Sequence, residues 1–122
     1  MFSAGEILSG ISAGLHVYFF YLESISFKSS PRTQRIFIGR AGENNADLVK
    51  VSSSLLFNQG FYNLFLALGT LFGLFANHPI LIRFTLLFYV AAGAVLFISS
   101  PTKYQGAVIQ SVPALLALLL LK

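Results

Sequence analysis

Four long apolar runs decide what this chain can fold into. They cover, approximately, residues 7–26, 51–76, 80–99 and 104–121. Each run is close to the ~20 residues that a helix needs to cross the hydrocarbon core of a bilayer. Charged residues make up only 10% of the chain, whereas a soluble domain carries roughly 25% and needs them to cover its surface. We therefore expect an all-α fold, with one integral membrane domain over residues 1–122 built as a four-helix bundle.

The long connection between the first two runs is expected to hold a short interfacial amphipathic helix. Ser30 and Pro31 form a helix-start signal, and Gly39 is placed to end the helix. Its basic side chains would face lipid phosphates while its aliphatic side chains point into the bilayer. The residues expected to contact headgroups are Lys28, Arg32, Arg35 and Arg40.

The net charge of +4 does not indicate a nucleic-acid-binding protein. Most basic residues lie in the loop after the first run, where anionic lipid headgroups are the nearer partner. The connections after the first and third runs hold six of the eight basic residues, and the other side holds Arg83 and Lys122. This bias places the six in the cytoplasm and both termini outside, in a multi-pass protein of the cell's inner membrane.

Neither the N-terminus nor the cysteine and histidine content points to processing or to metal binding. The N-terminus lacks a basic region and a small-residue cleavage site, so the first run is expected to be a retained span. Cysteine is absent, which excludes disulfides and thiolate chemistry. The two histidines, His16 and His78, fall in different parts of the chain, and His78 lies in an Asn-His-Pro turn signal. We expect no metal site and no cofactor.

The first run carries two ionisable residues, His16 and Glu23, in the stretch LHVYFFYLE. Seven positions are nearly two helical turns, so the two side chains share a face about 10 Å apart along the axis. Ser9 and Ser12 extend the same stripe. A polar stripe is costly in lipid unless it faces the interior of a bundle, which makes it the default place to look for function.

Further polar residues occur in the second run, as NQGFYN, and in the fourth. At ~1.5 Å per residue from the cytoplasmic end, these amides reach the depth of His16, and Glu23 lies nearer the cytoplasm. Gln59 and Asn63 share one helix face, while Asn58 and Tyr62 form a neighbouring one, so not all four can point inward equally. The predicted ligand or proton pocket comprises His16, Glu23, Asn58, Gln59, Tyr62, Asn63 and Gln110.

Each of these residues taken alone also has a structural explanation. An Asn, Gln or Ser in a span commonly ties helices together, at ~0.6 kcal/mol per hydrogen bond. Glu23 can reach the interface or pair with Lys28 or Arg32. A mid-membrane histidine is rare, so His16 favours function more strongly. The functional interpretation therefore depends on the whole constellation.

Three stretches, LHVYFFYLE, NQGFYN and QSVPALLAL, carry a resemblance to a known family. Through them the chain resembles small bacterial integral membrane proteins known as domain of unknown function 1304, over nearly its full length. The residues that match the family's pattern are His16, Glu23, Asn58, Gln59, Gly60, Tyr62, Asn63, Gln110, Pro113 and Ala114. The resemblance implies a four-span membrane fold and no settled activity.

Three classes of function remain open. The first is proton-coupled transport of a small amphipathic or lipid-like molecule by a homodimer, with Glu23 binding the proton or a cationic substrate and His16 relaying the proton. The second is a structural or accessory membrane subunit whose polar layer serves assembly only. The third is an intramembrane acid/base enzyme, such as a lipid isomerase, with His16 and Glu23 at two ends of a substrate. The sequence assigns no catalytic residue.

Overall fold

The computed structural model describes residues 1–121 and shows an all-helical chain. Within that range there are five α-helices and no strand, which confirms the predicted helical class. Lys122, one of the basic residues counted above, lies outside the described residues. The chain forms two compact units, described separately below: residues 1–16 with those described from 66 onward, and residues 17–65.

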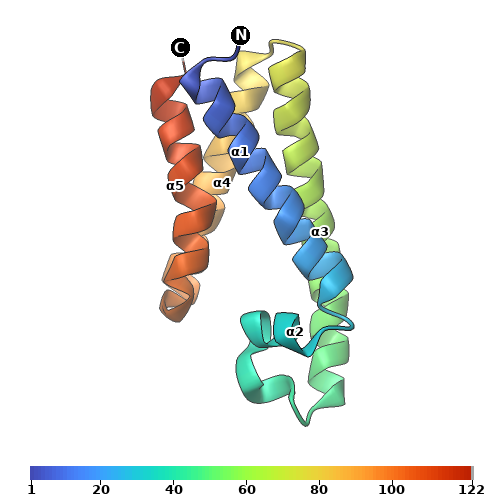
Figure 1. Cartoon of the computed structure of the whole chain (residues 1–122). Helices are drawn as coiled ribbons and strands as arrows, with labels where there is room; N and C mark the ends of the chain where they lie inside the picture. Colours follow the sequence, from blue (N-terminus) through green and yellow to red (C-terminus); the bar gives the residue numbers. More distant parts are fainter. Residues whose placement is uncertain (122) are drawn as a thin grey trace. The chain divides into compact units, whose positions relative to one another are not determined.

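The helices follow the apolar runs. They are α1 (Ala4–Phe20), α2 (Pro31–Ile38), α3 (Ala46–Phe75), α4 (Pro79–Ser99) and α5 (Tyr104–Leu120), in chain order (Figure 1). Short turns join them, namely the π-helical turn η1 (Tyr21–Ser26) and the 3-10 turns η2 (Gly39–Gly42) and η3 (Pro101–Lys103).

Three helical stretches are long and apolar enough to cross a membrane: α3, α4, and α5 together with η3. This indicates a membrane protein, as expected. Helix α1 is shorter, at 17 residues, because the π turn η1 follows it directly.

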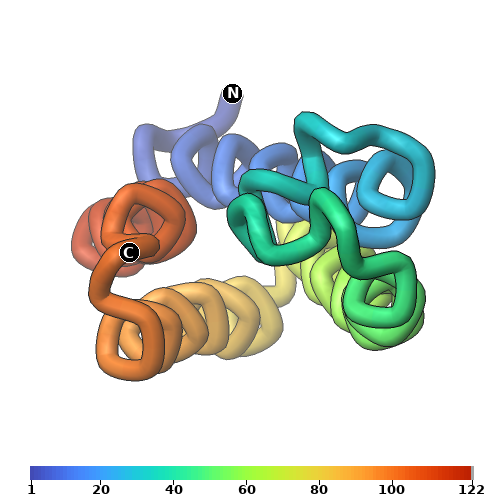
Figure 2. The backbone as a smooth tube through the Cα atoms, turned by 90° about the horizontal axis from the view of Figure 1, so that it is seen from below, coloured from blue at the N-terminus to red at the C-terminus, as the bar shows by residue number. Residues whose placement is uncertain are grey.

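The first unit is built on α4 and α5, which lie side by side (Figures 1 and 2). Its core consists of Leu74, Ile82, Leu86, Tyr89, Ala114 and Ala117. The Ser111 hydroxyl donates to the Val90 carbonyl at 3.2 Å, and a Cβ on Gly93 would lie 1.7 Å from that hydroxyl. A glycine at position 93 therefore lets the two helices approach closely.

The two ends of this unit also meet. A Cβ on Gly5, at the start of α1, would lie 2.8 Å from the backbone nitrogen of Leu121. The beginning of α1 therefore packs against the end of α5. At the start of α4, Asn77 adopts a left-handed conformation with φ of 50°, and the His78 side chain accepts the N–H of Leu81 at 3.4 Å. This is the turn predicted from the Asn-His-Pro sequence.

In the second unit, the ends of the short helix α2 are those predicted. The Ser30 hydroxyl accepts the N–H of Thr33 at 3.3 Å, and Pro31 occupies the first helical position. Gly39 ends the helix with φ of 61° and ψ of −147°, a conformation that is essentially restricted to glycine. The predicted helix is confirmed, and its place at a membrane interface stays a prediction.

Helix α2 is held against the chain that precedes it. The Gln34 amide donates to the Phe27 carbonyl at 2.8 Å, and the hydroxyls of Ser26 and Thr33 lie 2.6 Å apart. The buried Phe27 ring meets Phe37 edge-on, with centroids 6.0 Å apart. These contacts leave the opposite face of α2 exposed.

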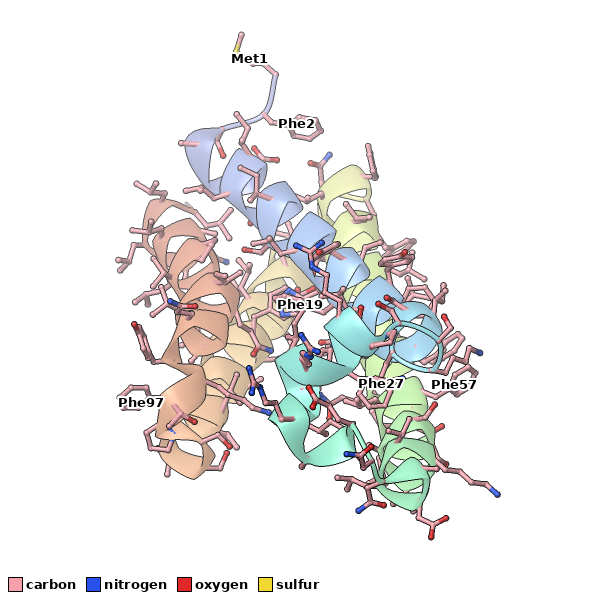
Figure 3. The ribbon with its side chains drawn as sticks, turned by 60° about the horizontal axis from the view of Figure 1, so that its bottom comes forward. Met1, Phe2, Phe19, Phe27, Phe57 and Phe97 are labelled. Atoms are coloured by element: carbon pink, nitrogen blue, oxygen red, sulfur yellow. The ribbon has the colours of Figure 1, made fainter. Side chains whose placement is uncertain are left out.

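The four residues expected to contact headgroups, Lys28, Arg32, Arg35 and Arg40, are all exposed. The Lys28 ammonium lies 5.4 Å from the centroid of the Phe57 ring of α3. Phe57 is labelled in Figure 3. Arg35 pairs with Glu43 at 3.2 Å, an exposed ion pair of the kind that contributes little stability. Contact with lipid headgroups stays a prediction.

Candidate functional site

Glu23, in the second unit, is the only buried residue among the four acidic residues of the chain. Its exposed fraction is 4%, whereas Glu43 and Asp47 are exposed and Glu6 is half-buried. A buried carboxyl group is costly unless it is hydrogen-bonded, neutralised or paired with a cation. The groups around Glu23 therefore decide what it can do.

Glu23 lies in the π turn η1, which continues α1. The backbone N–H of Phe27 bonds to the Leu22 carbonyl five residues earlier, at 2.9 Å. A π turn has more residues per turn than an α turn, so neighbouring side chains diverge less around the axis. Glu23 and Ser24 are both buried as a result and both contact α3. Single π turns of this kind occur frequently at functional sites.

Two amides from α3 bind the carboxylate, one on each oxygen. Gln59 Nε2 donates to Glu23 Oε2 and Asn63 Nδ2 donates to Glu23 Oε1, both at 2.5 Å. The two amides are one helical turn apart, so they reach the same side of α3. Asn63 is half-buried, whereas Gln59 is exposed. The hydrogen bond from Gln59 thus connects the buried carboxyl group of Glu23 to an exposed side chain.

Gly60 brings α3 close enough for these bonds. A Cβ at that position would lie 1.9 Å from Ser24 Oγ, 3.0 Å from Ser24 Cβ and 3.1 Å from Ser24 N. The Ser24 hydroxyl donates to the Phe57 carbonyl at 2.8 Å. One turn later in α3, the Phe61 ring contacts the Phe20 ring, with centroids 5.0 Å apart. The glycine inside NQGFYN therefore serves the approach of the two helices.

No lysine or arginine in the described range, residues 1–121, forms an ion pair with Glu23. The pairing with Lys28 or Arg32 considered from the sequence is thus not made. The negative charge of the ionised acid is met by two neutral amides only. This arrangement leaves Glu23 able to take a proton or a cation from outside the chain.

His16 belongs to the first unit and is fully buried. Its Nδ1 lies 2.8 Å from the Ser12 carbonyl, and because a carbonyl can only accept, Nδ1 carries the proton. The imidazole stacks on the Tyr89 ring of α4, with centroids 3.7 Å apart and an interplanar angle of 18°. His16 is therefore held in one orientation by α1 and α4.

A hydroxyl cluster next to this stack was not predicted from the sequence. Thr70 Oγ1 of α3 lies 2.7 Å from the Tyr89 hydroxyl and 2.8 Å from Thr85 Oγ1, and Thr85 can donate in turn to the Ile82 carbonyl at 3.0 Å. All three hydroxyl residues are buried. The four-residue spacing of Thr85 and Tyr89 in a mostly apolar span was the available signal.

Within the second unit, the structure brings together three residues of the predicted pocket. Glu23, Gln59 and Asn63 form one hydrogen-bonded site. Asn58 and Tyr62 lie on an exposed face of α3. His16 and the half-buried Gln110 belong to the other unit. Among the described residues, no three His, Cys, Asp or Glu side chains gather in a way that could hold a metal ion.

Comparison with known proteins gives one relationship. No curated protein and no solved structure shows significant similarity to the chain. Residues 10–122 match the sequence model of a family described as protein of unknown function (DUF1304), and the matched stretch contains Glu23, Gln59 and Asn63. Because the match covers nearly the whole chain, the protein belongs to the DUF1304 family.

Proposed function

We propose that this protein is a four-span membrane protein that transports a small amphipathic molecule in a proton-coupled manner. Glu23 binds either the proton or the cationic group of that molecule. The observation that carries the proposal is the environment of Glu23, a carboxylate bound by two amides and buried without a lysine or arginine partner. An intramembrane acid of this kind is the usual mark of an ion or proton pathway.

The amide pair suits a group that changes its protonation state. When Glu23 is ionised, both amides donate to it, as the present geometry has them. When Glu23 is protonated, one amide turned about its terminal bond offers a carbonyl oxygen to the new O–H. The same side chains therefore satisfy both states of the carboxyl group. Gln59 is the exposed member of this network, so a proton or ligand would reach it first.

The four-span arrangement requires α1 and η1 to form the first crossing together. They follow one another without a break from Ala4 to Ser26, which at ~1.5 Å per residue is enough for a ~30 Å hydrocarbon core. The positive-inside bias then favours both termini outside the cell's inner membrane. Lys28, Arg32, Arg35 and Arg40 would meet anionic headgroups on the cytoplasmic side.

A purely structural role is the second candidate, favoured by the first unit. There the Thr70 hydroxyl bonds to those of Thr85 and Tyr89, and His16 stacks on the same tyrosine. Such a cluster joins three helices and needs no ligand to be stable. Protonation and flux at Glu23 separate this alternative from the proposed function.

The first test uses dicyclohexylcarbodiimide, which forms stable adducts with protonated carboxyl groups in apolar surroundings. Applied to the protein in lipid nanodiscs and followed by peptide mass spectrometry, it should modify Glu23 and spare the exposed Glu43 and Asp47. Modification should fall as the pH is raised. The Glu23→Gln variant should take up no stable adduct. Equal labelling of Glu43, or an unmodified Glu23, would count against the proposal.

The second test measures proton entry into liposomes that contain the protein and a trapped pH-sensitive dye. A potassium diffusion potential imposed with valinomycin should drive protons through the wild type and not through Glu23→Gln. The matched control is Glu43→Gln, which removes an exposed glutamate and should leave the flux unchanged. Equal flux in wild type and Glu23→Gln would overturn the assignment of this residue.

A further inference from the structure

One face of α3 in the second unit repeats exposed side chains at alternating spacings of four and three residues. These residues, which we call the α3 seam, are Val51, Leu55, Asn58, Tyr62 and Phe65, and all five are exposed. At about 100° per residue the α3 seam points away from Gly60, the position that faces Ser24. This spacing is the one by which two helices interlock side chains along a shared seam.

We propose that the α3 seam is the contact between two copies of this chain, and that Asn58 pairs with its counterpart across the two-fold axis. The inference goes beyond the function of Glu23 and shares with it only the placement of α3 in the membrane.

Asn58 is the residue that indicates a second copy of the chain as the partner of the α3 seam. It lies eight positions after Lys50, about 12 Å along the helix axis, which is inside the hydrocarbon core if Lys50 marks the headgroup level. Its amide is exposed, and no hydrogen bond joins it to any residue from Met1 to Leu121. Acyl chains offer no hydrogen-bond partner, so an amide on a lipid-facing surface is costly.

A second copy satisfies this amide by symmetry. In a two-fold contact, equal residues near the axis face one another, and an Asn side chain carries both a donor and an acceptor. Two Asn58 amides can therefore satisfy each other. Tyr62 follows one turn later on the same face and is 66% exposed, so its hydroxyl adds a second polar contact along the seam. A single Asn in such a seam also fixes the register of the two helices.

Disulfide cross-linking tests the seam directly because the chain has no cysteine. Single cysteines at Leu55 and Tyr62 should give cross-linked dimers in native membranes under mild oxidation. The matched control is Phe57→Cys, an exposed position about 120° around the helix from the seam, which should remain monomeric. Cross-linking at Ile11→Cys of α1 instead, or equal cross-linking at Phe57, would overturn the proposal.

Removing the amide tests the role of Asn58. Asn58→Leu should weaken dimerisation, measured by energy transfer between labelled copies in liposomes, by about tenfold, the effect of two interhelical hydrogen bonds. Asn58→Gln, which keeps the amide, should stay closer to wild type. Unchanged association in Asn58→Leu would overturn the pairing. Membrane flotation of each variant distinguishes weakened association, the expected result, from loss of the protein from the bilayer, which would count against the four-span proposal instead.

Discussion

Within NQGFYN, Gly60 decides which neighbours reach the acid. Its missing Cβ allows α3 to lie against Ser24, and this contact turns the Gln59–Asn63 side of the helix toward Glu23. With α3 in this orientation, Asn58 and Tyr62 lie on its exposed side. One residue without a side chain therefore divides four polar neighbours into two groups with different roles.

Gly60→Ala should destabilise the protein by about 1–3 kcal/mol, the usual range for an overpacked contact. A rotamer change of Ser24 moves its hydroxyl away but leaves the added Cβ in tight contact with Ser24 Cβ at 3.0 Å and Ser24 N at 3.1 Å, so the two backbones must also shift slightly. The free energy of unfolding can be measured by titrating detergent-solubilised protein with sodium dodecyl sulfate. The control is Gly10→Ala, where a Cβ meets nothing within 4 Å. A stability loss as large in Gly10→Ala as in Gly60→Ala would contradict this explanation.

The sequence predicted polar residues at the site and could not pair them. Counting depth along the spans grouped the amides in one layer and did not predict that Gln59 and Asn63 bind the two oxygens of Glu23. The π turn is the physical reason why counting is insufficient, since it changes the direction of the side chains that follow Phe20. No pattern in the first run marks a π turn, so the side-chain directions were predicted from regular α-helix geometry.

At the scale of elements, predictions from local chemistry succeeded. Ser30 caps α2 and Gly39 ends it, as predicted. Caps and glycine stops are read from a few adjacent residues, so no tertiary information is needed. Contacts between helices, such as that of Tyr89 with His16 and Thr70, depend on crossing geometry and were missed.

The contact of Tyr89 with α1 and α3 can be divided into a stack and a hydrogen bond. Tyr89→Phe keeps the stack on His16 and removes the bond to Thr70, and should cost about 0.6 kcal/mol. Tyr89→Leu removes both and leaves a gap in the core, so it should cost about 2 kcal/mol or more. Detergent unfolding measures both values. Tyr104→Phe, at an exposed tyrosine, should change stability little, and equal costs for Phe and Leu at position 89 would refute the importance of the stack.

At the scale of the whole molecule, the number of crossings depends on α1. Helices α3 and α4 are each long and apolar enough to cross a membrane, and so is the continuous stretch of η3 and α5. Helix α1 reaches a comparable length only when η1 is added, and η1 contains the buried acid. The proposed site and the proposed topology are therefore linked, because a first segment that did not cross would leave Glu23 outside the hydrocarbon core.

Cysteine labelling of the natural cysteine-free background tests this link. Single cysteines at Phe2 and Ala76 should react with a membrane-impermeant maleimide added to intact cells, because the N-terminus and the α3–α4 turn lie outside in the proposed topology. Cysteines at Ser29 and Thr102 should react only after the membrane is permeabilised. All four positions are exposed, so accessibility reports the side of the membrane. If Phe2 and Ser29 reacted alike, α1 and η1 would not cross, and the four-span proposal would fail. A fully inverted pattern would retain four crossings and reverse only the orientation, placing the basic segment around α2 outside the cell.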